Sequence, residues 1–188
     1  MLSPSLEHLL AQHCAPALLG NKAANLVALP HREFPDPQAA AALCAREFSG
    51  CGLAFRVLCT CGRYSQLLVY RPALLVRRLR QPHTQRLLGA YGYPVGAGVE
   101  QLLTALQGRF AAGAGFPHEI GLFLDFPPAD VEGFIRSRGE ACKLCGYWKV
   151  YADVEEARIR FACFDACRHC LCAAVAAGHS LPTLLKAA

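Results

Sequence analysis

The stretch Leu53-Ala-Phe-Arg-Val-Leu-Cys-Thr-Cys-Gly-Arg-Tyr-Ser-Gln-Leu-Leu-Val-Tyr70 decides the fold of this chain. Its two ends, residues 53–58 and 66–70, are apolar and carry valine, tyrosine and phenylalanine, residue types that favour strands. The segment between them, residues 59–65, contains Gly62 and predicts a β-hairpin with a slightly long turn. Helical patterns surround this hairpin on both sides, so we expect an α/β or α+β fold.

The flanking sequence alternates helical patterns with short strand patterns. Strands are expected over residues 24–29 and 146–151, and residues 122–126 fit either a strand or the end of a helix. Helices are expected over residues 6–19, 38–48, 73–80, 84–90 and 99–112, from the Pro127-Pro128 pair through Arg136, and from Asp153 as N-cap to about Ala177. No linker interrupts this series. The prediction is therefore a single layered domain over residues 1–188, with a small mixed sheet, including one hairpin, packed by several helices.

The composition indicates a cytoplasmic protein. Hydrophobic residues make up 54% of the 188 residues, yet the sequence has no run of about 18 apolar residues that could span a bilayer. The first residues lack the basic and apolar regions of a signal peptide. The chain has 11 cysteines, and in a reducing compartment we expect them to be thiols, metal ligands or small core residues.

The net charge of +5 owes much to a cluster of arginines between residues 70 and 88. Its members are Arg71, Arg77, Arg78, Arg80 and Arg86. A basic amphipathic segment predicts either a solvated helix face or a surface that recognises an acidic protein partner. Nucleic-acid binding is not expected, because the segment lacks interleaved aromatic residues and any nucleic-acid motif.

Two cysteine clusters raise the question of a metal. Cys142 and Cys145 have a two-residue gap and precede Gly146, a pattern that forms half of a tetrathiolate knuckle. Cys167 and Cys170 share the same gap. The predicted ligands for zinc or iron are therefore Cys142, Cys145, Cys167 and Cys170, with Cys59, Cys61 and His169 as other candidates.

Core packing is the alternative for the second cluster, and thiol redox chemistry is a third interpretation. On a helix, Cys163, Cys167 and Cys170 lie within about 60° of one another, while Cys172 points roughly the opposite way. The same stripe carries Ile159, Ala166, Ala174 and Ala177. Because cysteine is readily buried as a small apolar residue, this interpretation predicts that the Cys/Ala face packs on the sheet.

Five segments of the chain together resemble a known family. They are Cys14-Ala-Pro-Ala-Leu-Leu-Gly-Asn-Lys-Ala-Ala-Asn-Leu26, Gly92-Tyr93-Pro94, Phe116-Pro-His-Glu-Ile-Gly-Leu-Phe-Leu124, Asp130-Val-Glu-Gly-Phe-Ile135 and Gly146-Tyr-Trp-Lys-Val-Tyr151. In this order they resemble the bacterial domain-of-unknown-function family 3793, found mostly in anaerobic Firmicutes, and the resemblance implies no particular activity. Where that family usually has Leu-Gly-Tyr-Pro, this chain has Asp125-Phe126-Pro127 in place of the last three residues.

The resembling segments concentrate reactive residues in loops and at element ends, which defines a candidate catalytic site. Its members are Cys14, Lys22, Asn25, His118, Glu119 and Lys149, with Tyr151 nearby in sequence. In this hypothesis Cys14 and His118 form a nucleophilic dyad that Glu119 orients. Lys22 or Asn25 polarises a substrate oxygen. Lys149 faces a pocket and binds an anion, since period-two alternation puts it on the strand face opposite Trp148 and Val150.

The same residues have structural interpretations. Cys14 fits a small buried position at a helix end, Lys149 fits a solvated surface, and the pair His118-Glu119 fits the cap of the following element or part of a metal site completed by distant ligands. Two functions therefore stay open. One is thiol-dependent or transition-metal-handling chemistry in the cytoplasm. The other is a non-catalytic binding or adaptor protein with a basic arginine-rich face and cysteines that pack the core.

Overall fold

The computed structural model describes residues 1–112 and 115–187, with the side chain of Cys61 left aside. The fold is mixed α/β, as the sequence predicts. The chain forms two compact units: a terminal unit, Met1–Ala73 with Phe164–Ala188, and a central unit, Leu74–Cys163. That both units make one domain stays a prediction. Within the described residues no helix is long and apolar enough to cross a bilayer.

The hairpin organises the terminal unit. It joins β2 (Ala54–Cys61) to β3 (Tyr64–Tyr70), and β1 (Ala24–Pro30) pairs with the other edge of β3. The hairpin is confirmed, but its turn is tighter than predicted, because the ladder continues to the pair Cys61 and Tyr64. Gly62, at the turn, has a φ of +57°, a left-handed conformation that glycine adopts without steric cost.

The pairing in this sheet differs from the mixed sheet expected from sequence. Both β1 and β2 run antiparallel to β3. The helix α2 (Pro37–Glu47) carries the chain from β1 to β2, which lie parallel to each other but on opposite edges. The central strand of the sheet is therefore β3, and it pairs antiparallel with both of its neighbours. This arrangement is a split β-α-β unit.

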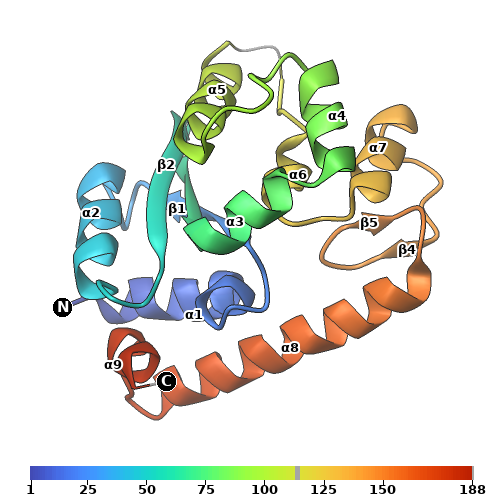
Figure 1. The fold of residues 1–188 in the computed structure, drawn as a ribbon. Helices are drawn as coiled ribbons and strands as arrows, with labels where there is room; N and C mark the ends of the chain where they lie inside the picture. Colours follow the sequence, from blue (N-terminus) through green and yellow to red (C-terminus); the bar gives the residue numbers. More distant parts are fainter. Residues whose placement is uncertain (113–114, 188) are drawn as a thin grey trace. The chain divides into compact units, whose positions relative to one another are not determined.

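Helices cover this sheet and are fixed at their ends. The helix α1 (Pro4–Leu18) contacts β1 and β3, and α2 contacts β2 and β3 (Figure 1). Arg71, directly after β3, donates from Nε to the Ala17 carbonyl at 2.7 Å, from Nη1 to the Cys51 carbonyl at 3.1 Å, and from Nη2 to the Leu18 carbonyl. The last carbonyls of a helix lack intrahelical partners. Arg71 is thus a structural cap rather than part of a basic surface.

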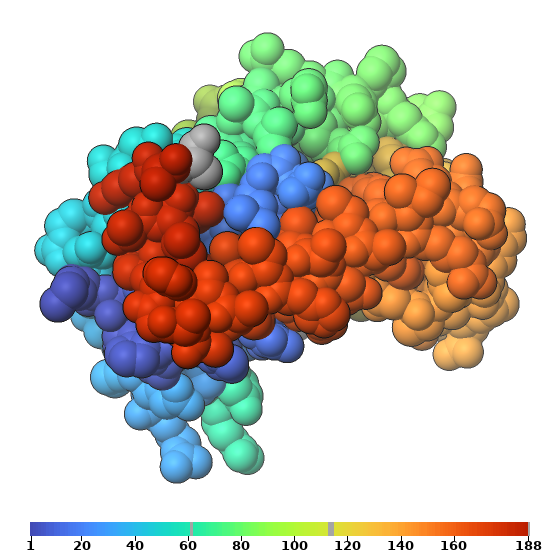
Figure 2. Space-filling model, turned by 90° about the horizontal axis from the view of Figure 1, so that it is seen from below, coloured from blue at the N-terminus to red at the C-terminus, as the bar shows by residue number. Residues whose placement is uncertain are grey.

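The long helix α8 (Val154–Ala176) buries a different face from the one predicted. Its N-cap is confirmed, because Asp153 Oδ1 accepts from the Glu156 amide at 2.9 Å. The buried positions are Ala157, Phe164, Cys167 and Leu171. Cys163 and Cys170 are exposed and Ile159 is 71% exposed, and Figure 2 shows α8 lying on the surface in orange. The predicted Cys/Ala face is therefore wrong, because burying Phe164 and Leu171 removes more apolar area from water. A short helix α9 (Leu181–Lys186), which the sequence analysis does not anticipate, ends the terminal unit.

The central unit is mostly helical. It contains α4 (Pro82–Ala90), α5 (Val99–Ala111), α6 (Ile120–Phe123) and α7 (Pro128–Arg136), preceded by α3 (Pro72–Leu79), which begins at its boundary. A small hairpin of β4 (Leu144–Cys145) and β5 (Lys149–Val150) follows. The predicted strand over residues 146–151 shrinks to β5, because residues 146–148 form the hairpin turn. The predicted alternation holds, since Trp148 and Val150 are buried.

A glycine makes the packing of α7 against the segment after β5 possible. A Cβ atom on Gly133 would lie 2.6 Å from Cγ of Tyr151, closer than real Cβ contacts. Gly108, inside α5, has nothing within 4 Å of the same position. The two helical glycines therefore differ only in their surroundings.

We expect Gly133→Ala to lower the free energy of unfolding by about 1–3 kcal/mol, because the added methyl group displaces the Tyr151 ring. The matched change Gly108→Ala should raise it by about 0.5–1 kcal/mol through helix propensity. Urea unfolding followed by far-UV circular dichroism measures both. Equal effects of the two changes would show that Tyr151 does not pack against α7.

Candidate functional site

The carboxylate of Asp130 accepts three hydrogen bonds inside the central unit. Asp130 lies in the first turn of α7 and is 2% exposed. Its Oδ2 accepts from the indole Nε1 of Trp148 at 2.7 Å, and its Oδ1 accepts from the amides of Tyr151 at 2.7 Å and Ala152 at 2.9 Å. A buried carboxylate is stable only with such partners. Asp130 therefore fixes Trp148 and the end of the hairpin to α7.

Beside this anchor lies a cavity of about 190 Å³. It is lined by Phe116, His118, Ile120, Gly121, Leu124, Phe126, Asp130, Val131, Phe134, Trp148 and Lys149. Phe126 stacks on Trp148 with ring centroids 5.2 Å apart. Aromatic and aliphatic groups thus form most of the wall, with few polar groups, as in typical small-molecule sites.

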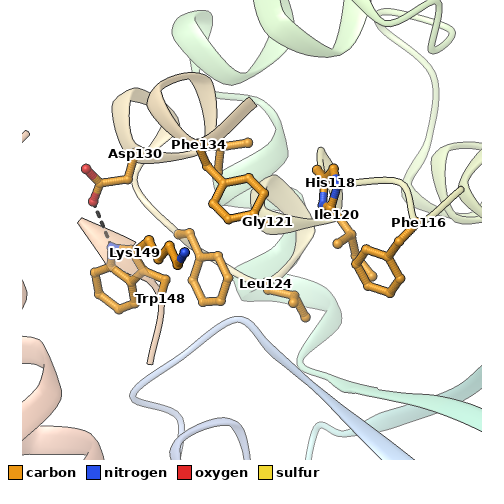
Figure 3. A pocket seen from close by; sticks show the side chains of 11 residues that line it. Phe116, His118, Ile120, Gly121, Leu124, Asp130, Phe134, Trp148 and Lys149 are labelled. Atoms are coloured by element: carbon orange, nitrogen blue, oxygen red, sulfur yellow. Dashed lines mark hydrogen bonds between the residues drawn. The ribbon is translucent and has the colours of Figure 1, made fainter. Parts of the chain in front are cut away.

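The charge that faces the cavity is positive. Figure 3 shows the Lys149 side chain extending toward the cavity, while the Asp130 carboxylate points away from it toward its hydrogen-bond donors. Lys149 Nζ donates to the Gly139 carbonyl at 2.6 Å, which holds the side chain in place. An ammonium group has three N–H donors, so Lys149 can also donate to a ligand.

His118 and Glu119 are adjacent in sequence but have separate surroundings. The His118 ring is exposed and lies between Phe116 and Phe134, with centroid distances of 5.8 and 5.0 Å. Glu119 is buried; it accepts from the Tyr93 hydroxyl at 3.1 Å and pairs with Arg109 at 3.3 Å. Burial, and then this carboxylate, raise the pKa of Tyr93 well above its usual value.

The capping alternative for this pair is wrong. Glu119 occupies the N-cap position of α6 but makes no side-chain capping hydrogen bond. Its carboxylate is held by Tyr93 and Arg109 instead, and the Arg109 guanidinium stacks on the Tyr93 ring at 4.6 Å. The physical reason is that a buried carboxylate gains more from a cation and a hydroxyl than from amides at a helix end.

The other three predicted catalytic residues belong to the terminal unit. Cys14 is completely buried in α1, and burial raises the pKa of its thiol well above the ordinary value, an effect that nearby Lys22 partly offsets. Lys22 is 4% exposed and lies over the Phe164 ring at 5.6 Å. Asn25 Oδ1 accepts from the Ala17 amide at 3.1 Å. These surroundings favour the packing interpretation of Cys14, and its dyad with His118 stays a prediction.

The predicted metal ligands are likewise divided. Cys142 and Cys145 belong to the central unit, and Cys167 and Cys170 to the terminal unit. Cys167 is buried and accepts from Asn21 Nδ2 at 3.3 Å. Among the residues that the structure describes, no group of three or more His, Cys, Asp and Glu side chains could hold a metal. The Cys59 candidate lies in β2, and the Cys61 side chain lies outside the described residues. Zinc or iron binding by these four cysteines stays a prediction.

Asp125, the residue that stands where the resembling family usually has glycine, has a left-handed backbone with φ +63°. The carboxylate pairs with Arg78, and Arg160 donates to the Asp125 carbonyl at 2.7 Å and approaches the carboxylate at 3.7 Å. Aspartate tolerates this conformation better than most residues. The ionic contacts therefore offset the absence of glycine.

The arginine-rich segment is only partly a surface. Arg71 caps α1 and Arg78 binds Asp125, whereas Arg77, Arg80 and Arg86 are exposed. Sequence reasoning therefore overestimates the basic face. It also misses Asp130, Phe126 and Phe134, which fix or line the cavity; the one available signal is the match of residues 130–135 to the family pattern.

The family model described as "Protein of unknown function (DUF3793)" matches residues 10–185. The chain belongs to this family. The match covers both units and nearly the whole length, which confirms the resemblance seen in the sequence. No curated protein and no solved structure matches the chain.

We expect Asp130→Asn to lower the free energy of unfolding by about 1–3 kcal/mol, because an amide nitrogen would then face the indole N–H of Trp148. The control Asp153→Asn, at the exposed N-cap of α8, should change it by less than about 0.5 kcal/mol, since asparagine caps helices as well as aspartate. Trp148 is the only tryptophan, so its fluorescence in a urea titration reports on this site. A small effect at position 130 would contradict the anchoring role.

If Cys14 is a packing residue, its thiol should react slowly with alkylating reagents. In the folded protein, iodoacetamide should label the exposed Cys145, Cys163 and Cys170 well before the buried Cys14 and Cys44, because only accessible thiolates react. Mass spectrometry of peptides over a time course measures the order. Labelling of Cys14 first would restore the nucleophile hypothesis.

Proposed function

We propose that this chain is a non-catalytic binding protein that takes a small aromatic carboxylate in the cavity of the central unit. The observation that carries the proposal is the arrangement around Lys149, whose ammonium group extends toward a cavity with aromatic and aliphatic walls. The walls come from α6, α7, the hairpin and the segment before α6. They suit a flat apolar ring, and the cation suits its acid group.

Size and charge define this ligand. A cavity of about 150 Å³ is enough to hold a benzene ring, and this one is about 190 Å³. One ring with one carboxylate therefore fits. The Lys149 ammonium favours an anion, since a charge-assisted hydrogen bond contributes about 1.5–3 kcal/mol, and it disfavours a cation of the same shape.

We favour binding over catalysis because the buried carboxylates near the cavity already have protein partners. Asp130 accepts three hydrogen bonds, and Glu119 is held by Tyr93 and Arg109. Neither carboxylate is therefore placed for proton transfer in the cavity. This favours the binding class over thiol-dependent or metal-handling catalysis, which stays a prediction, as do the cytoplasmic location and the acidic protein partner.

The test compares benzoate, benzyl alcohol and benzylamine, which share a ring and differ in charge. Quenching of Trp148 fluorescence should give the affinity order benzoate, then benzyl alcohol, then benzylamine. Lys149→Gln should weaken benzoate about 10-fold or more, the equivalent of about 1.4 kcal/mol or more, and leave benzyl alcohol nearly unchanged.

The matched control is Lys143→Gln. Lys143 lies just before β4 and also donates to a backbone carbonyl, that of Ala152, but it does not line the cavity. Lys143→Gln should leave the affinities for benzoate, benzyl alcohol and benzylamine unchanged. Equal binding of the three ligands, or an equal loss in both lysine variants, would contradict the proposal, provided that circular dichroism shows both variants folded.

A further inference from the structure

A second cavity of the central unit differs from the first in its charges. It has a volume of about 270 Å³, and among the described residues it shares only Phe116 and His118 with the cavity beside Lys149. Its other polar side chains in the described part of the chain are Tyr91, Arg109 and Glu119. The wall of the second cavity therefore carries a cation and a carboxylate together.

The carboxylate of Glu119 fixes the Arg109 guanidinium at this wall. Arg109 Nη1 lies 3.3 Å from Glu119 Oε1, which also accepts from the Tyr93 hydroxyl at 3.1 Å. The guanidinium stacks on the Tyr93 ring as well, with its Cζ atom 4.6 Å from the ring centroid. Because these contacts position the cation before a ligand arrives, less conformational freedom is lost when a ligand binds.

Both charged groups keep hydrogen-bonding capacity for a ligand. A guanidinium has five N–H donors, and the Arg109 side chain is 38% exposed. Both contacts of the Glu119 carboxylate use Oε1, and no hydrogen bond reaches Oε2 from the residues that the structure describes. Oε2 is not one of the fully buried atoms without a partner. It can therefore accept from a ligand in the cavity that Glu119 lines.

The opposite charges of Arg109 and Glu119 decide which ligand group fits. An anion would bind the guanidinium but meet the carboxylate, a cation would meet the reverse, and either ion would lose hydration on entry. A neutral primary carboxamide avoids these costs, because its oxygen accepts from the guanidinium and its NH₂ group donates to the carboxylate. Phe116 and Ile135 supply apolar wall, and about 150 Å³ already holds a benzene ring.

We propose that the cavity beside Arg109 and Glu119 is a second binding site, which takes an aromatic primary carboxamide. The ring lies against the apolar wall, and the amide group bridges the guanidinium and the carboxylate. This site goes beyond the aromatic carboxylate site, since Arg109 and Glu119 line the second cavity and not the first.

The three isoleucines of the chain give each cavity its own reporter. Ile135 lines the second cavity, Ile120 lines the first, and Ile159 is exposed on α8. In NMR spectra of the full chain with ¹³C-labelled isoleucine δ-methyl groups, benzamide should shift the Ile135 signal and benzoate the Ile120 signal. Ile159 should respond to neither ligand. A failure of the carboxylate site at Ile120 is thus distinguished from a failure of the carboxamide site at Ile135.

The affinities measured at Ile135 test the recognition of the amide. Benzamide should bind about 10-fold more tightly or better than benzoate, benzylamine and acetophenone, the factor that one hydrogen bond to a charged group contributes. Acetophenone resembles benzamide in shape but has no N–H to donate to Glu119. An Ile135 signal that benzamide leaves in place, or equal affinities for benzamide and acetophenone, would overturn the assignment.

The second test is Glu119→Gln, which removes the negative charge but keeps an oxygen that accepts from Tyr93 and Arg109. The charge of Arg109 is then uncompensated, so benzoate should overtake benzamide in affinity at Ile135. The matched control Glu140→Gln, at an exposed position that lines neither cavity, should keep the original order. The same order of affinities in the folded Glu119→Gln variant as in the parent chain would contradict the role given to Glu119.

Discussion

The hydrogen bonds of the Asp130 carboxylate are the constraint on which the central unit depends. Two of them come from the amides of Tyr151 and Ala152, which lie between the end of β5 and the start of α8 and so lack regular backbone partners. The third comes from the Trp148 indole. One buried charge thus satisfies three donors that would otherwise be costly to bury, and the donors in turn stabilise the charge. These three hydrogen bonds therefore hold the hairpin of β4 and β5 against α7.

A second chain of contacts runs from Trp148 to Asp125. The Arg160 guanidinium lies over the indole at 4.9 Å and also binds Asp125, which pairs with Arg78. Phe126 and Phe161 pack on the indole as well, with centroids 5.2 and 4.5 Å away. Trp148 is therefore held on its ring atoms and on its nitrogen. This fixes one wall of the cavity, while the exposed His118 and Phe116 lie on the side away from Trp148 (Figure 3).

Periodicity predicted most of the elements, because the spacing of apolar residues reports on the local backbone. The hairpin, α2, α5 and the N-cap of α8 are confirmed with ends that shift by only a few residues. The predictions that were wrong concern features set by contacts between residues far apart in the sequence. The turn after β2 is tight because β3 supplies partners past Cys59, and the buried face of α8 contains Phe164, Cys167 and Leu171 but leaves Cys163 and Cys170 exposed. In the sequence, Asp130 resembles any acidic residue in the first turn of a helix. Only the folded structure shows that its carboxylate binds Trp148 and the Tyr151 amide.

The cysteines also show that the sequence does not reveal burial. They are identical in composition, yet the fold buries some of them and exposes others. Cys14 and Cys44 lie in the core, where desolvation raises both thiol pKa values, that of Cys44 to about 12. Such thiols act as small apolar groups. Cys145 instead ends β4 and pairs with Lys149 across the hairpin, and Cys142 lies just before β4. Lys149 extends toward the apolar cavity, whereas the Tyr151 hydroxyl has no hydrogen-bond partner among the residues that the structure describes. One short hairpin, held by Asp130, therefore presents Lys149 and Tyr151 to different surroundings, although residues two apart share a face.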